Sequence, residues 1–188
     1  GNTTDTTNVT VNKSAVNLTV NNAGATTLTT GADNVVTMDA TSVIGTELTV
    51  KGEGNATLVF AADDLNTKKI TNAKTSGDLI IKSADTDGED ISKVQATLVE
   101  FTAAQASGAT TVATGANLKY SAAAGAINVT IAGTSTNDTA TAELTASQTS
   151  VASTGVETLN VKANATATSG ADLTIGTLTT GANKVVLT

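Results

Sequence analysis

The sequence reads Leu28-Thr29-Thr30-Gly31-Ala32-Asp33-Asn34-Val35-Val36 near its start and Leu178-Thr179-Thr180-Gly181-Ala182-Asn183-Lys184-Val185-Val186 near its end, and seven of the nine positions are identical. A shorter form, Ser or Thr followed by Gly-Ala and then Asp or Asn, recurs at Thr114–Asn117 and Ser169–Asp172. Glycine suits the positive-φ position of a tight turn, and Asp or Asn can cap the backbone amides that follow. The unequal separations between copies predict a degenerate repeat with insertions.

Between such turns, apolar residues alternate with Thr, Asn or Lys in short runs. This period of two, in β-branched residues, is typical of short strands. Two stretches, 63–69 and 92–106, lack the alternation and are rich in Leu, Lys, Gln, Ala and Glu, so each could form a helical turn or two. The runs that predict strands are Val9–Val11, Val16–Val20, Leu48–Val50, Leu58–Phe60, Leu79–Ile81, Ile127–Ile131, Leu159–Val161 and Leu173–Ile175.

Two all-β architectures suit a chain of short strands joined by tight turns, the parallel β-solenoid and tandem β-sandwich domains. The types of side chain available to fill the core favour one of them. A sandwich interior about 10 Å thick is normally filled by aromatic rings or a disulfide, whereas aromatic residues make up 2% of this chain and Cys is absent. A solenoid core is narrower and accepts stacked Val, Ile, Leu, Ala and Thr. We therefore predict an all-β chain folded as a parallel, β-helix-like solenoid with short irregular or helical insertions. Tandem β-sandwich domains remain the alternative.

The 188 residues fit a single β-rich module, with room for an insertion around residues 61–106. The sequence starts at Gly1 and stops directly after a strand-like run. Natural solenoids cover their open ends with a cap, and neither terminus resembles one. We expect a piece excised from a longer surface protein.

The composition argues against most catalytic classes. The chain has no His and no Cys, and its ten basic residues are all Lys, so the usual general base, the soft metal ligands and the bidentate anion clamp are missing. Asp63-Asp64 could be read as a glycosidase dyad, but no Arg or His is available to position a sugar. Ser92 and Lys93 are adjacent, and adjacent residues on a strand or helix do not face each other. We expect no enzyme.

The charge distribution narrows the partners. The formal net charge is −7 and the Lys residues are scattered, so no basic stripe is available for nucleic acid. No apolar run is long enough to cross a bilayer. We expect neither nucleic-acid binding nor membrane insertion.

One acidic segment is a candidate metal site. Asp85, Asp87, Glu89 and Asp90 place four carboxylates in six residues around Gly88. Hard oxygen ligands on a glycine-containing loop are what Ca²⁺ prefers, although the glycine comes too early for an EF-hand loop. A solvent-exposed acidic turn is the alternative interpretation.

The Thr-, Ala-, Asn-, Gly- and Val-rich composition and the segment Gly155-Val156-Glu157-Thr158-Leu159-Asn160-Val161-Lys162 resemble bacterial surface-layer proteins, especially those exported by type I secretion. The resemblance implies a structural module of a self-assembling extracellular coat on the bacterial cell surface, with Ca²⁺ as cofactor. Its partners would be neighbouring copies in a lattice and a cell-surface glycan bound through other parts of the chain. An adhesin or a flagellin variable domain is the alternative.

Overall fold

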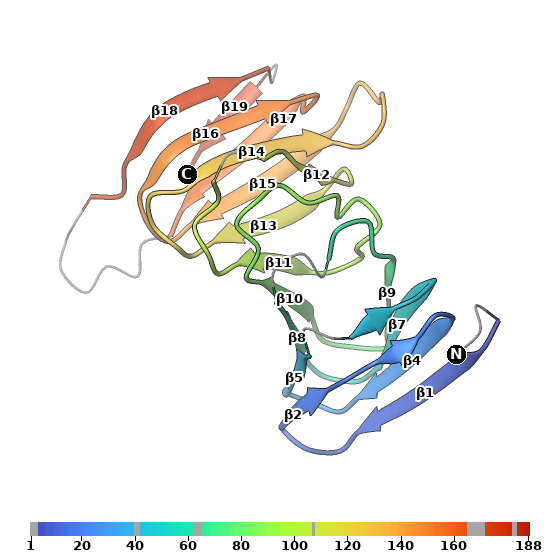
Figure 1. Cartoon of the computed structure of the whole chain (residues 1–188). Coiled ribbons are helices and arrows are strands. Elements are labelled where there is room, and N and C mark those ends of the chain that lie inside the picture. The colour runs from blue at the N-terminus through green and yellow to red at the C-terminus, as the bar shows by residue number, and fades with distance from the viewer. Residues whose placement is uncertain (1–3, 40–41, 62–64, 107, 165–171, 182–183) are drawn as a thin grey trace.

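The chain folds as an all-β parallel solenoid of about 8 turns. The computed structural model describes residues 4–39, 42–61, 65–106, 108–164, 172–181 and 184–188. Every strand pair in this part of the chain is parallel, and successive coils stack along one axis from the N-terminal to the C-terminal end (Figure 1). The prediction of a parallel β-solenoid is confirmed.

One side of the solenoid is a nine-stranded sheet in the order β19-β17-β15-β13-β11-β10-β8-β5-β2. Each coil contributes one strand to it. The strands are β2 Ala15–Leu18, β5 Asn34–Met38, β8 Ala56–Phe60, β10 Leu79–Ser83, β11 Leu98–Phe101, β13 Ala116–Tyr120, β15 Thr139–Leu144, β17 Thr158–Ala163 and β19 Lys184–Leu187.

A second side consists of two four-stranded sheets. The coil between these sheets has no strand on this side, but isolated bridges connect it to both of them, from Val94 to Ile70 and from Asp90 to Thr111. Among the described residues, the third side carries a two-stranded sheet of β3 Asn21–Asn22 and β6 Val43–Ile44. The four-stranded sheets contain β1 Thr6–Val11, β4 Ala25–Thr30, β7 Glu47–Gly52 and β9 Ile70–Lys74, and then β12 Thr110–Val112, β14 Ala126–Ile131, β16 Gln148–Thr154 and β18 Ile175–Thr180.

The coils are unequal in length. The register step from Ile80 to Leu98 is 98 − 80 = 18 residues, and the step from Ser150 to Thr177 is 177 − 150 = 27 residues. Strand residues nevertheless alternate between buried and more exposed positions, as in the pattern of β14 and β15. Insertions are therefore absorbed in the turns while the strands keep one face toward the core.

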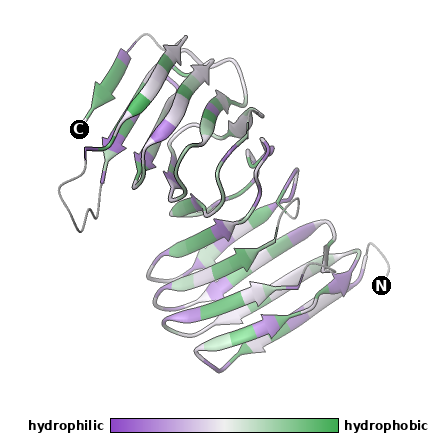
Figure 2. Ribbon diagram, turned by 60° about the vertical axis from the view of Figure 1, so that its left-hand side comes forward, coloured by the Kyte–Doolittle hydropathy of each residue, from purple (hydrophilic) through white to green (hydrophobic). Residues whose placement is uncertain are grey.

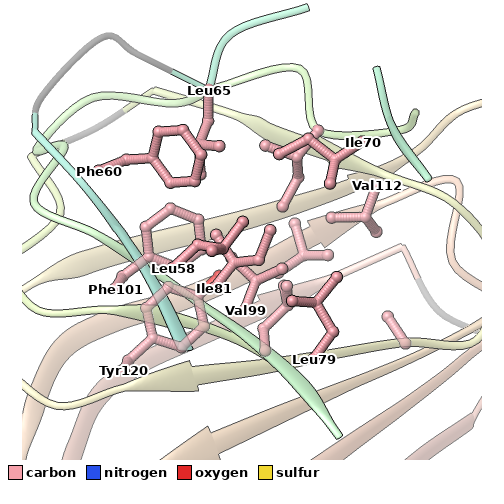
Figure 3. Close-up of a cluster of buried hydrophobic side chains, with 14 of the residues drawn as sticks. Leu58, Phe60, Leu65, Ile70, Leu79, Ile81, Val99, Phe101, Val112 and Tyr120 are labelled. Carbon is pink, nitrogen blue, oxygen red and sulfur yellow. The ribbon is translucent and has the colours of Figure 1, made fainter. Parts of the chain in front are cut away.

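The core is a set of side-chain ladders rather than a layer of aromatic rings, as Figure 2 indicates by the apolar colour repeated from coil to coil. All three rings of the chain lie buried in the middle of the stack (Figure 3). Phe60, Ser83, Phe101 and Tyr120 occupy one register row. The rings of Phe101 and Tyr120 stack with centroids 5.2 Å apart, a geometry that contributes beyond buried area alone.

The repeated turn differs in detail from the prediction. In the first copy the positive φ falls on Asp33 (φ 57) and Gly31 has none. Asn34 does not cap the amides that follow it, because its Oδ1 accepts a hydrogen bond from the preceding Gly31 amide at 2.6 Å and its Nδ2 donates to the Lys13 carbonyl of the neighbouring coil at 2.7 Å. Asp33 can adopt its positive φ because Asp is among the residues that tolerate the left-handed conformation. At Gly115 (φ 80) the predicted positive φ of the glycine is confirmed, while the Asn117 Nδ2 donates to the Thr97 carbonyl of the neighbouring coil at 3.3 Å.

The expected helical turns are absent from the described residues. The segment after 61 contributes β9, β10 and β11 to the stack. The second stretch, 92–106, contains β11 because Val99 and Phe101 point into the core, and this packing overrides the local helix propensity. In the first stretch, residues 65–69 form a turn and an extended segment, and residues 63 and 64 lie outside the described part.

Buried amide side chains close the corners of the coils. Gln148 accepts a hydrogen bond from the Gly125 amide and donates to the carbonyls of Ala122 and Ala146. These bonds satisfy backbone groups that the strand ladders leave unpaired at the corner.

No helix among the described residues is long and apolar enough to span a membrane.

Candidate functional site

The segment Asp85–Asp90, which we call the acidic loop, follows β10 on the third side of the solenoid. The loops of the coils before and after it hold it in place, because the Thr67 amide donates to the Asp90 carbonyl and the Ala106 amide donates to the Thr86 carbonyl. The Thr111 amide donates to the Glu89 carbonyl. The loop is therefore packed between two coils.

Two of its carboxylates point inward. Asp85 is 3% exposed and Glu89 is 1% exposed, and their side chains contact each other by a hydrogen bond. The Asp85 Oδ1 accepts from the Asp87 amide at 2.8 Å, and the Ser83 hydroxyl lies 3.5 Å from the Glu89 Oε2. Two acceptor-only groups cannot bond to each other unless one carries a proton.

That proton belongs to Glu89. Burial, followed by the hydrogen bond and the negative charge of Asp85, raises its pKa from 4.5 to about 8. A buried carboxyl that faces a carboxylate favours the neutral form, because a second buried charge would have no countercharge. At neutral pH the pair is therefore a carboxyl that donates to a carboxylate.

The other two carboxylates point elsewhere. Asp87 is exposed to solvent. The Asp90 Oδ1 accepts hydrogen bonds from the Ser92 hydroxyl at 2.6 Å and the Ser92 amide at 3.0 Å. The Ser92 hydroxyl, followed by the Ser92 amide, holds the pKa of the Asp90 carboxyl below its ordinary value against a smaller opposing effect of burial.

The structure thus divides the predicted calcium ligands into a buried pair and two outward carboxylates. Among the described residues, no three acidic, His or Cys side chains gather as a group that could hold a metal ion. Ca²⁺ requires six to eight oxygen ligands around one point, and this arrangement does not supply them. Calcium binding by Asp85, Asp87, Glu89 and Asp90 stays a prediction, and it would require the loop to rearrange.

Ser92 and Lys93, considered above as a catalytic pair, do not form a reactive arrangement. The Ser92 hydroxyl donates to Asp90, and Lys93 is exposed at the surface. Asp63 and Asp64 lie outside the described residues.

The structure also reveals a charged row that the sequence did not indicate. Lys82, Glu100, Lys119, Glu143 and Lys162 occupy consecutive positions of one register row on the outer face of the nine-stranded sheet. We call this row the charge ladder. Each of its residues comes from a different strand, and positive and negative side chains alternate along the stack.

The inner part of the charge ladder is paired within the chain. The Glu100 carboxylate lies 3.2 Å from the Lys82 Nζ and 3.2 Å from the Lys119 Nζ. Burial opposes ionisation of Glu100, but hydrogen bonds from Lys119 and Lys82 outweigh it and hold the pKa of this carboxyl below its ordinary value. Glu143 Oε1 accepts from the Asn164 Nδ2 at 2.9 Å. Lys162, the member of the charge ladder nearest the C-terminal end of the stack, is exposed to solvent.

Comparison of the chain with protein-family models, with curated proteins and with solved structures found no match.

Proposed function

We propose that this chain is a structural module of a self-assembling extracellular surface layer. The observation that carries the proposal is the uninterrupted nine-stranded parallel sheet, to which every coil contributes one strand. About 8 turns at about 4.8 Å per turn give a body roughly 40 Å long. Backbone hydrogen bonds run along its whole length, so the body resists bending and suits a coat subunit.

The outer surface supports the same proposal. On the first four-stranded sheet, Thr27, Thr49 and Thr71 form an outward row of short polar side chains. On the second, Thr111, Thr130 and Thr154 form a similar row. Such flat polar faces present little for a small substrate to enter, and they can pack against other flat surfaces.

We propose further that the module has no catalytic role. The residue types on which most enzymes rely, His, Cys and Arg, do not occur in the sequence. Among the described residues, the carboxyl whose pKa is strongly raised is that of Glu89, which is buried beneath the surface. Calcium, if bound, would act on the assembly of the coat rather than on a reaction.

The experiment is electron microscopy of the parent cell with gold-labelled antibodies against this module. A surface-layer role predicts a periodic lattice outside the cell, label distributed over the lattice, and loss of the lattice when the module is deleted from the gene. Label in isolated clusters or fibres on an otherwise smooth surface would favour the adhesin alternative. Label confined to the cell interior would contradict both.

A further inference from the structure

We propose that the outer face of the nine-stranded sheet is the surface through which this chain docks onto a second copy of itself. The inference rests on the proposed function and deepens it, because it assigns one face of the module to a contact within the coat. Two features of that face carry it, an apolar patch and the charge ladder.

The apolar patch lies on the N-terminal half of the face. Val35, Ile80 and Leu98 belong to one outward register row, in which Thr57 stands between Val35 and Ile80. Val59 lies in the next outward row, as the register partner of Lys82. Val35 is 40% exposed, and the other three aliphatic side chains are partly exposed. Aliphatic side chains clustered on the outer face of a parallel sheet leave apolar area in water, and such patches mark interaction surfaces.

The charge ladder lies beside this patch and extends toward the C-terminal end. Its five residues alternate in sign from Lys82 to Lys162. Coils stack at about 4.8 Å, so like charges repeat about every 9.6 Å along the axis. A partner that matches this row must present opposite charges at the same interval, and a parallel β-solenoid with one charged residue per coil does so. This chain is such a partner.

Two copies are complementary when the rows run antiparallel about a two-fold axis between the coils of β11 and β13. Lys82 then faces Glu143 of the second copy. Glu100, which is 7% exposed and pairs with Lys82 and Lys119 of its own chain, lies opposite Lys119 of the second copy. A shift by one coil would place like charges opposite each other. Isologous contacts of this kind are the usual basis of homodimers, and like-charge contacts in the wrong register give the docking its specificity.

The net charge also favours this face. The whole chain carries −7, which repels a second copy at most orientations. The charge ladder contains three Lys and two Glu, so it carries a net +1 and does not share the negative excess of the whole chain.

The test compares two single substitutions on opposite faces of the same part of the solenoid. Glu143→Lys makes three consecutive positive positions in the charge ladder and places lysine opposite lysine at two points of the proposed contact. Ala152→Lys adds a lysine to the outward face of β16, on the second four-stranded sheet. Sedimentation velocity over micromolar to millimolar concentrations measures the dissociation constant of each, and circular dichroism verifies the fold.

We expect the unmodified chain to dimerise, Glu143→Lys to raise the dissociation constant at least tenfold, and Ala152→Lys to leave it within twofold. The double variant Ile80→Thr/Leu98→Thr, which places β-branched threonine at both positions and so keeps a side chain that suits a strand, should also raise it at least tenfold, and it decides the matter if Glu143→Lys does not fold. A chain that remains monomeric at millimolar concentration, or equal effects of the two lysine variants, overturns the proposal. Monomers in solution together with a lattice on the cell would contradict the proposed docking surface but not the proposed coat function. Dimers in solution without any lattice on the cell would contradict the coat function but not the docking surface.

Discussion

At Gly52 the close stacking of coils is sensitive to a single methyl group. It has φ 114, and a Cβ added there would overlap the Thr30 carbonyl oxygen of the preceding coil and lie 2.9 Å from the Thr30 carbonyl carbon. Thr30 and Gly52 are register partners in β4 and β7. Gly133 has φ 115 and no atom within 4 Å of the corresponding point, so it provides a matched control with the same backbone conformation.

The two alanine variants therefore separate backbone strain from coil contact. A positive φ costs a non-glycine residue about 1–3 kcal/mol, and the reduced entropy of the unfolded chain returns about 0.4–1 kcal/mol. We expect Gly133→Ala to lower the free energy of unfolding by about 1 kcal/mol. Gly52→Ala must in addition push two coils apart, and the loss of two or three ladder hydrogen bonds at about 1 kcal/mol each brings its total to about 3–4 kcal/mol.

Urea unfolding followed by far-ultraviolet circular dichroism measures both values, and the denaturant dependence should be the same for the two variants. A difference of less than about 0.5 kcal/mol between Gly52→Ala and Gly133→Ala would refute the close contact between β4 and β7.

Three further predictions concern the interior. Because burial and Asp85 raise the pKa of Glu89 from 4.5 to about 8, the native chain keeps a proton that the unfolded chain has lost; the resulting stability is greatest below pH 4.5 and falls by roughly 5 kcal/mol as the pH rises through 8. Glu89→Gln should remove this slope in urea titrations at pH 5, 7 and 9, and an unchanged slope would show that another group titrates. If the acidic loop binds calcium at millimolar concentration, thermal melts with calcium and with chelator should differ for the unmodified chain and coincide for Asp85→Asn/Asp87→Asn; coincident melts for both would mean that the loop binds none. Phe101→Ala should lower the free energy of unfolding by about 3–5 kcal/mol because it empties the space beside Tyr120, and a loss below 1 kcal/mol in the same urea assay would contradict the buried ring stack.

The fold could be predicted because turns and alternation both point to stacked short strands. Some strands escaped notice where the alternation is between small residues. In β15, Thr139–Leu144, the buried positions are Ala140, Ala142 and Leu144 and the outward ones begin with two threonines. Ala and Thr differ little in polarity, so the period of two is faint there, and only the neighbouring coils specify the strand.

The candidate site was less predictable, because proximity in sequence does not fix the direction of a side chain. Asp85 and Glu89 point inward while Asp87 points to solvent, and the packing of adjacent coils decides this. The charge ladder was hidden for a related reason. Its steps, such as 100 − 82 = 18 and 143 − 119 = 24 residues, vary with turn length, so no fixed period exposes it in the sequence.

Spin-label distances along one outward register row test the parallel stack of coils most directly. The chain contains no Cys, so paired cysteines can be introduced without background at Thr141 with Thr57 and at Thr141 with Ala15. These residues belong to one row, four and six coils apart. Pulsed electron resonance should give distances of about 19 Å and about 29 Å, at about 4.8 Å per coil. Distances that fail to increase by about 10 Å between the two pairs would contradict the parallel solenoid.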